Sequence, residues 1–170
     1  MLIPVVDIPS SASLTTENTA TLLTFISHIG ILGPVLLRVS DITVEKETLA
    51  LNLVESATAS TACYIDGLTF DNDDLATKLL DKGARVLFFN ETAERELQAT
   101  VMKSLPRSRV GLNCTMKVFN VSKMLETINE CREYSEHFLF RCRIANGMIS
   151  RRLCQLTEAC IFAIVIDCRQ

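Results

Sequence analysis

Residues 61–90, TACYIDGLTFDNDDLATKLLDKGARVLFFN, decide the fold class of this 170-residue chain. Two short apolar runs, at 62–65 and 86–89, flank an amphipathic segment. A helix over that segment would gather its apolar residues on one face: Leu75, Ala76, Leu79 and Leu80. Gly83 is placed to end the helix, because glycine tolerates the backbone conformation that follows a helix. The stretch predicts a βαβ unit with two parallel, adjacent strands.

The same alternation recurs along the chain. Strands are expected at seven apolar segments, namely 2–8, 35–39, 62–65, 86–89, 109–114, 138–142 and 161–166. Helices are expected between them. The first covers 16–29, and three later ones are capped by Asp41 or Thr43, by Asn90 and by Asn120. The last helix carries Ile149, Leu153, Leu156 and Cys160. For the helix after Asn90 the spacing predicts a buried stripe of Ala93, Leu97, Val101 and Leu105.

Strict alternation of strand and helix indicates an α/β fold with a parallel βα repeat. We expect an incomplete, about seven-stranded TIM-barrel-like domain, and the alternative is an open doubly wound sheet. The length fits one domain over residues 1–170, which can also be the N-terminal part of a longer multifunctional chain.

Composition excludes several classes of function. A net charge of -3, with basic residues scattered along the chain, argues against a nucleic-acid-binding protein. Seven cysteines without a CxxC motif are expected to be reduced core thiols, so no metal site, disulfide framework or cofactor is predicted. The start of the chain lacks a secretory signal, and no apolar run approaches the ~20 residues that span a bilayer. The expected location is the cytoplasm, without membrane binding.

Ligands of parallel α/β proteins bind at the carboxyl ends of the strands. The polar residues expected there are Asp7, Ser40, Asp41, Asp66, Asn90, Asn113, Arg143 and Asp167. Asp7 lies within an apolar run, so it either acts as an acid or base toward a bound substrate or bonds backbone N–H groups of the next loop. Asp66 precedes Gly67 and is expected to form a turn, whereas Asp41 is expected to cap a helix.

Familiar catalytic motifs are missing from the sequence. It contains no GxGxxG, P-loop, GxSxG or HExxH pattern, which argues against nucleotide hydrolases and common metalloproteases. His28 and His137 are expected at the opposite end of the sheet from the ligand-binding end. Asp7 therefore remains the most informative candidate for a catalytic residue.

The opening residues, MLIPVVDI, resemble the first strand of the ribotide isomerases of histidine biosynthesis, a (βα)8 family related to the imidazole glycerol phosphate synthase cyclase subunit. The segments DDLATKLLDKGARVLFFNETA and RVGLN are similar to that family's third helix with fourth strand and to its fifth strand. The resemblance implies a phosphoribosyl substrate and an Amadori aldose–ketose isomerisation. It also implies that Asp7 is a catalytic acid/base.

A second resemblance covers the region from LGPVLLRVSDIT to RVGLNC, which is similar to the N-terminal segment of the fungal trifunctional histidine-biosynthesis proteins. In those proteins a degenerate barrel-like segment precedes phosphoribosyl-AMP cyclohydrolase, phosphoribosyl-ATP pyrophosphatase and histidinol dehydrogenase regions. None of the three catalytic regions occurs in this chain. The resemblance implies that its partners are such downstream domains.

Departures from the isomerase pattern favour a loss of catalysis. The second catalytic aspartate of the family is replaced by Asn113, and a neutral amide takes up no proton, which costs roughly 10²–10⁴ in rate. The phosphate-binding strand ends of the family are Gly-rich, whereas the corresponding ends here read Asn-Glu-Thr at 90–92 and Asp-Cys-Arg at 167–169. We expect a non-catalytic barrel-like domain; the alternatives are an active ribotide isomerase and an α/β interaction domain unrelated to histidine synthesis.

Overall fold

A computed structural model describes residues 3–8, 15–39, 42–117, 120–143 and 161–167. The chain divides into two compact units, Met1–Leu87 (unit 1) and Phe88–Gln170 (unit 2), and each is described by itself. The division falls within strand β4, Val86–Asn90. The expectation of a single domain stays a prediction.

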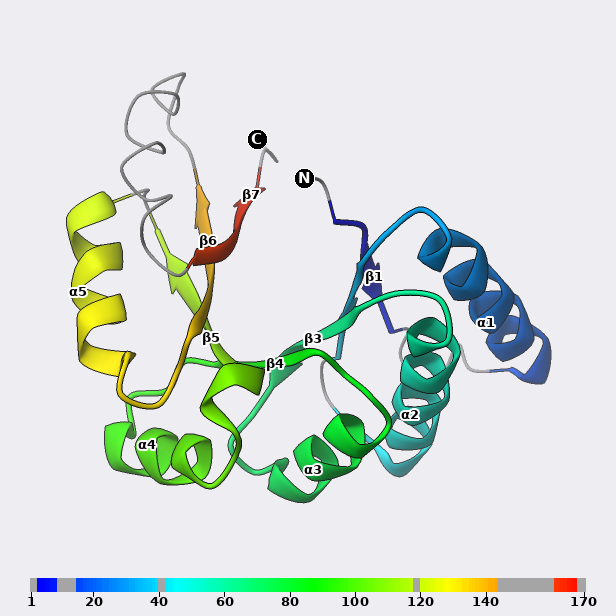
Figure 1. Cartoon of the computed structure of the whole chain (residues 1–170), viewed down its shortest axis with the longest axis horizontal. Coiled ribbons are helices and arrows are strands. Elements are labelled where there is room, and N and C mark those ends of the chain that lie inside the picture. Colours follow the sequence, from blue (N-terminus) through cyan, green and yellow to red (C-terminus); the bar gives the residue numbers. More distant parts are fainter. Residues whose placement is uncertain (1–2, 9–14, 40–41, 118–119, 144–160, 168–170) are drawn as a thin grey trace. The chain divides into compact units, whose positions relative to one another are not determined.

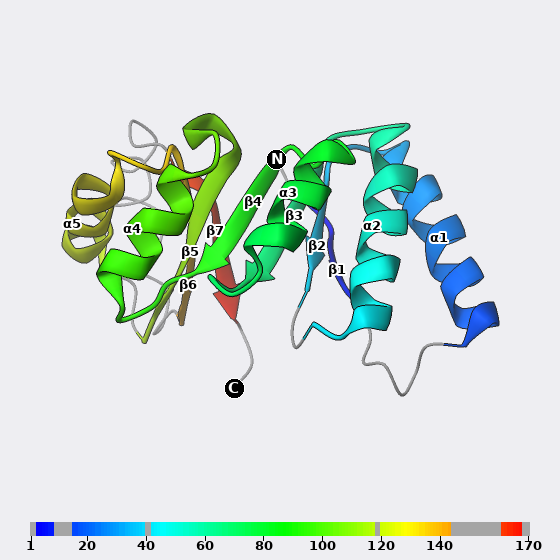
Figure 2. The same cartoon turned by 90° about the horizontal axis from the view of Figure 1, so that it is seen from below.

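Unit 1 consists of alternating strands and helices whose strands pair in parallel and in chain order (Figure 1). Its elements before β4 are β1 (Val5–Asp7), α1 (Thr16–Gly30), β2 (Val35–Arg38), α2 (Val44–Thr58), β3 (Cys63–Leu68) and α3 (Asp73–Asp81). The three helices follow one another in the same order as the strands (Figure 2). This arrangement makes each βα pair a repeat of the previous one.

Unit 2 continues the same alternation. Its elements after β4 are α4 (Arg95–Lys103), the 3-10 helix η2 (Arg107–Arg109), β5 (Val110–Met116), α5 (Val121–Cys131), β6 (His137–Arg143) and β7 (Ile161–Asp167). Strands β5, β6 and β7 pair in parallel and in chain order, with a register shift between Phe138 and Leu139. The predicted last helix, with Ile149, Leu153, Leu156 and Cys160, lies outside the described residues.

The predicted fold class is confirmed: the chain is an α/β protein with a parallel βα repeat of the incomplete TIM-barrel type. A doubly wound sheet reverses its strand order at a switch point, with crossovers running in both directions. Within each unit the strand order follows the chain without a reversal, so the doubly wound alternative is wrong.

Side-chain caps account for three of the helix starts among the described residues, and the first is α1, where the Thr15 hydroxyl accepts from the N–H of Asn18. The Thr43 hydroxyl accepts a hydrogen bond from the backbone N–H of Lys46, and the Asn120 side chain accepts one from the N–H of Lys123, both as predicted. Asn90 does not cap the next helix, because it is the last residue of β4 and α4 begins only after Glu94. A four-residue connection, rather than a single cap residue, separates these two elements.

Gly67 allows the close pairing of β2 and β3 in unit 1. Its φ is +92°, in the region that favours glycine, and an added Cβ would collide with the Val39 carbonyl. The Val39 N–H meanwhile donates to the Asp66 carbonyl at 2.8 Å. Glycine therefore lets the backbone of β3 lie against the end of β2, beside the candidate site.

The cores of both units follow the alternation that the sequence predicts. Strand residues such as Leu37, Ile65, Phe88 and Leu112 are fully buried, as expected for parallel strands covered by helices. Across the described ranges, none of the helices combines the length and apolar character that crossing a membrane requires.

Candidate functional site

A row of three charged side chains crosses the carboxyl ends of the first three strands in unit 1. Asp7 of β1 lies in register with Arg38 of β2, and Arg38 lies in register with Asp66 of β3. Residues in register on parallel strands point to the same face of a sheet. Chain topology therefore brings these side chains together from positions about 30 residues apart in sequence.

Arg38 binds both carboxylates of this row. Its Nη1 lies 3.3 Å from Oδ1 of Asp7, and its Nε donates to Oδ2 of Asp66, also at 3.3 Å. The three side chains differ greatly in exposure: Asp66 is fully buried, that of Arg38 is 25% exposed and that of Asp7 is 70% exposed. The row therefore runs from a buried ion pair to one that faces solvent, and its two carboxylates outnumber its single cation.

The turn predicted at Asp66 is wrong. Asp66 and Gly67 lie within β3, which extends to Leu68, and the Asp66 carboxylate is buried against Arg38. A buried carboxylate needs an ionic or hydrogen-bonding partner, and Arg38 of the neighbouring strand supplies one. The Asp-Gly pair reads as a turn in sequence because Arg38 lies 28 residues away and only the sheet register brings it close.

Asp7 has the ionic partner that its place in an apolar run requires. That partner is Arg38, so the side chain is engaged in an ion pair across the sheet. Asp7 also lies at the carboxyl end of its strand, where the sequence places it. The residues of the loop that follows, 9–14, lie outside the described part of the chain.

Unit 2 brings two amide side chains together, one from the end of β4 and one from the middle of β5. The Asn113 side chain is 4% exposed, and its Nδ2 donates to Oδ1 of Asn90 at 3.3 Å. The backbone N–H of Glu91 donates to the Asn113 carbonyl at 3.0 Å, while the Glu91 carboxylate pairs with Arg95 at 2.8 Å. Asn90 and Asn113 are thus brought together as neutral amides. Asn113 is the fourth of the seven residues of β5, so its predicted place at the strand end is wrong, because the strand continues to Met116.

The remaining predicted residues fall in several places. Ser40 and Asp41 lie outside the described residues; Arg143 and Asp167 end strands β6 and β7 in register with each other. His28 donates through Nδ1 to the Thr24 carbonyl at 2.7 Å, and Nε2 of His137 lies 3.0 Å from the Ser108 carbonyl. His137 begins its strand, so it lies at the end opposite to the candidate ligand side, as predicted.

A buried polar cluster between α4 and the end of α5 is absent from the sequence-based prediction. Gln98 is fully buried; its Nε2 donates to the Tyr134 hydroxyl at 3.0 Å and its Oε1 accepts from the N–H of Thr92 at 3.3 Å. The Tyr134 hydroxyl in turn donates to Sγ of Cys131 at 3.1 Å. The buried face of α4 carries Gln98 and Met102, so the predicted stripe through Leu97, which is 39% exposed, is wrong.

Cys63, Cys114 and Cys131 are buried thiols, as predicted. Burial raises the pKa of Cys63 to about 12, and it also raises the pKa of Cys114, where a hydrogen bond with Glu91 acts in the same direction. Burial raises the pKa of Cys131, although its bond with Tyr134 opposes the change. Nucleophilic and metal-binding cysteines need a lowered pKa, so these thiols fit the core rather than a reactive site.

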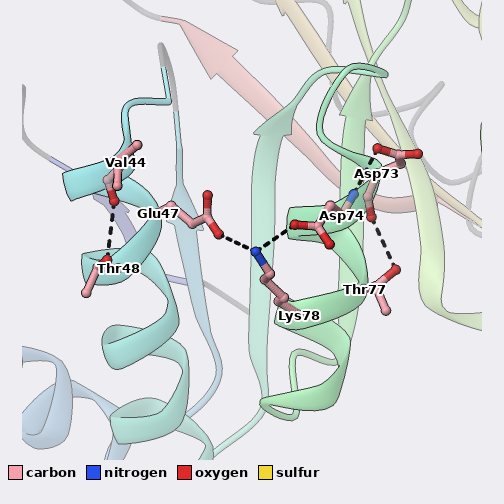
Figure 3. Close-up of polar contacts among 7 residues, drawn as sticks. All are labelled: Val44, Glu47, Thr48, Asp73, Asp74, Thr77 and Lys78. Carbon is pink, nitrogen blue, oxygen red and sulfur yellow. Dashed lines mark hydrogen bonds and ion pairs between the residues drawn. The ribbon is translucent and has the colours of Figure 1, made fainter.

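Charged residues also line the outer surface between α2 and α3. Lys78 of α3 lies between Glu47 of α2, at 2.8 Å, and Asp74 of its own helix, at 2.6 Å (Figure 3). One turn further on, Lys82 pairs with Glu55 at 2.8 Å. These side chains are about a third or more exposed, so the pairs orient two neighbouring helices rather than form a binding site.

The residues that the structure describes contain no group of three or more His, Cys, Asp or Glu side chains arranged to hold a metal ion. The fold therefore defines an α/β protein of the parallel βα-repeat type, with an ionic row across the strands of unit 1 and an amide pair between β4 and β5. Neither a family model nor a curated protein matches the chain.

Proposed function

We propose that this chain is a non-catalytic, barrel-derived domain of a histidine-biosynthesis multifunctional protein, working as a folding or assembly module. The observation that carries the proposal is the ion pair of Asp7 with Arg38. Asp7 corresponds to the catalytic acid/base of the ribotide isomerases that the sequence resembles. Proton transfer requires that carboxylate to be directed at a substrate, whereas here it is directed at a guanidinium that also binds Asp66.

The second catalytic position supports the same proposal. Asn113 replaces the family's second aspartate, and its amide is almost fully buried and donates to Asn90. A neutral amide exchanges no proton near pH 7, so this position supplies no general acid or base. The frame of βα units is kept while both catalytic positions are occupied by structural contacts.

An active ribotide isomerase is the second candidate, and the position of Asp7 favours it. Asp7 lies at the carboxyl end of β1 with a side chain 70% exposed, where a substrate could reach it. In that case Asp7 would be the acid/base and Asn113 would hold sugar hydroxyls of a phosphoribosyl substrate. Arg38 would then have to release Asp7 when the substrate binds.

Genetic complementation separates the two candidates. The full chain is expressed in a histidine-requiring strain that lacks the isomerase, and folded, soluble protein is verified in the cells. Our proposal predicts no growth without histidine. Growth that depends on Asp7, and is lost in Asp7→Asn, would establish the isomerase instead.

The assembly role has its own test in the gene. We expect the reading frame to continue into a cyclohydrolase region with an Asp-x-Asp-x-Asp metal motif, followed by pyrophosphatase and dehydrogenase regions. A gene without such regions would favour an α/β interaction domain unrelated to histidine synthesis. If the regions are present, deleting residues 1–170 is expected to lower the yield of soluble downstream protein without abolishing its specific activity.

A further inference from the structure

Helix α1 has a surface unlike that of the neighbouring helices. Only Ile26 and Gly30 of its 15 residues are buried, and helices with so much exposed surface normally carry charges there. Glu17 is the one Asp, Glu, Lys or Arg residue in α1, whereas α2, of the same length, has four. Depletion of charge on an exposed surface is typical of the centre of a protein interface.

Apolar side chains are exposed on and beside this helix. Phe25 is 51% exposed, and Ile31 and Leu32, which follow the end of α1, are 76% and 87% exposed. Beside Phe25 lies an open hollow of about 450 Å³, lined by Glu17, Ala20, Thr21, Thr24 and Phe25. The outward surface of α1 therefore offers a large apolar side chain next to a space bordered by small ones.

Helix α2 covers one flank of α1 only. The hydroxyl groups of Ser27 and Ser56 lie 2.9 Å apart where the two helices meet, and α1 stands at the end of the row of helices in unit 1 (Figure 2). Because β1 is the first strand in the order of unit 1, no further βα pair of that unit follows on this side. The hollow and Phe25 thus lie on a surface that the described residues of unit 1 leave open.

We propose that α1 packs against α1 of a second copy of the chain, antiparallel and with two-fold symmetry. In such a pair, residues equally distant from the midpoint face each other. A midpoint between Leu22 and Leu23 places Phe25 opposite Ala20 and Thr24 opposite Thr21. The ring of Phe25 would then enter the hollow of the other copy, which supplies the contact of a large side chain with small ones that close helix packing requires.

Glu17 and His28, near the two ends of α1, fit the same arrangement. The midpoint that pairs Phe25 with Ala20 also places Glu17 opposite His28, a carboxylate facing an imidazole. His28 uses Nδ1 to bond the Thr24 carbonyl, so Nε2 is the ring nitrogen that can meet the second copy. The two Glu17 carboxylates would lie at opposite ends of the helix pair, about 16 Å apart, which exceeds the screening length of about 8 Å in physiological salt. A second copy therefore fits this surface without like-charge repulsion.

Sedimentation equilibrium of the full chain tests the proposal. An interface of one helix from each copy is small, so we expect a dimer with a dissociation constant on the order of 10 µM. Phe25→Asp is expected to raise that constant at least ~10-fold, and Ala20→Arg, which fills the hollow, is expected to do the same. The matched control is Val44→Asp on α2, since Val44 is 79% exposed and does not line the hollow. It should leave the constant unchanged.

A charge exchange tests the orientation of the helices. Glu17→Arg alone should weaken the dimer. Adding His28→Glu in the same chain should restore it, because the new cation of each copy then faces the new carboxylate of the other. Circular dichroism confirms that each variant is folded. The proposal is overturned if the wild-type chain stays monomeric up to ~200 µM, well above the expected constant. It is also overturned if Phe25→Asp and Ala20→Arg dimerise as the wild type does, or if Val44→Asp weakens the dimer as much as they do.

Discussion

The two units bring polar side chains together with different chemistry on the same kind of frame. In unit 1 a guanidinium binds two carboxylates, one of them fully buried, whereas in unit 2 one amide side chain donates to another. Both sets lie on parallel strands that follow chain order. The comparison teaches that the βα repeat fixes where side chains meet, while the residue type at each register position decides whether they form an ionic or a neutral contact.

Glycine substitutions should have the largest effect and should differ between the units. Gly67→Ala in unit 1 meets the Val39 carbonyl and requires a positive φ, so we expect a loss of about 4 kcal/mol in unfolding free energy. Gly111→Ala in unit 2 meets the buried Phe88 ring and the His137 carbonyl but requires no positive φ, so the loss should be smaller. Urea denaturation of both variants measures the difference. An equal or reversed order would contradict the assigned backbone of β3.

Breaking the ionic row should come next in size. Arg38→Met leaves the Asp66 carboxylate buried without its guanidinium, and we expect a loss of about 3 kcal/mol. Asp7→Asn removes the exposed partner of the same guanidinium and should cost less than about 1 kcal/mol. Chemical denaturation at neutral pH compares the two variants directly. Similar losses in both would mean that burial does not distinguish the two carboxylates.

The buried polar cluster around Gln98 in unit 2 should show an intermediate loss of stability. Gln98→Leu removes the donor to the Tyr134 hydroxyl and the acceptor for the Thr92 N–H, so we expect a loss of about 2 kcal/mol. Its neighbour Leu97 is the matched control, because Leu97→Gln changes a half-exposed side chain and should cost less than about 0.5 kcal/mol. A larger loss from Leu97→Gln than from Gln98→Leu would mean that the apolar stripe through Leu97, and not Gln98, forms the buried face of α4.

The buried thiols come last, because their titration affects stability only above about pH 9. The pKa of Cys63 is raised from 9.0 to about 12 by burial, so the folded state favours the protonated thiol. Its contribution to stability is complete below pH 9 and is lost as the pH rises from 9 toward 12. In that window the wild-type unfolding free energy should fall faster than that of Cys63→Ala, by about 1 kcal/mol per pH unit. Parallel slopes for the two proteins would contradict the burial of this thiol.

The sequence predicts the βα repeat well because each strand and helix depends on a short, local pattern of residues. Apolar runs mark the strands, and threonine or asparagine caps mark the starts of α2 and α5. The fully buried residues of α3 are those that the spacing predicts. Each of these features depends on residues close together in the chain, so the fold class follows from sequence alone.

Contacts across strands and helices are what the sequence leaves open. Nothing near Asp66 reveals that Arg38 will bind it, because the pairing depends on the register of β2 and β3. Gln98 likewise reads as a surface residue until α5 brings the Tyr134 hydroxyl to it. The position of Asp7 at the end of its strand was predictable, whereas the partners of Asp7 and Asn113 were not. Those partners are what bear on catalysis.

The central claim is that the carboxylate of Asp7 serves the ionic row rather than proton transfer. Its most direct test is an assay of the purified full chain for the Amadori rearrangement of the phosphoribosyl substrate used by ribotide isomerases, with wild-type protein and Asp7→Asn side by side. If Asp7 serves only the ionic row, neither protein shows turnover above the uncatalysed rate. Turnover by the wild type that disappears in Asp7→Asn would contradict the claim.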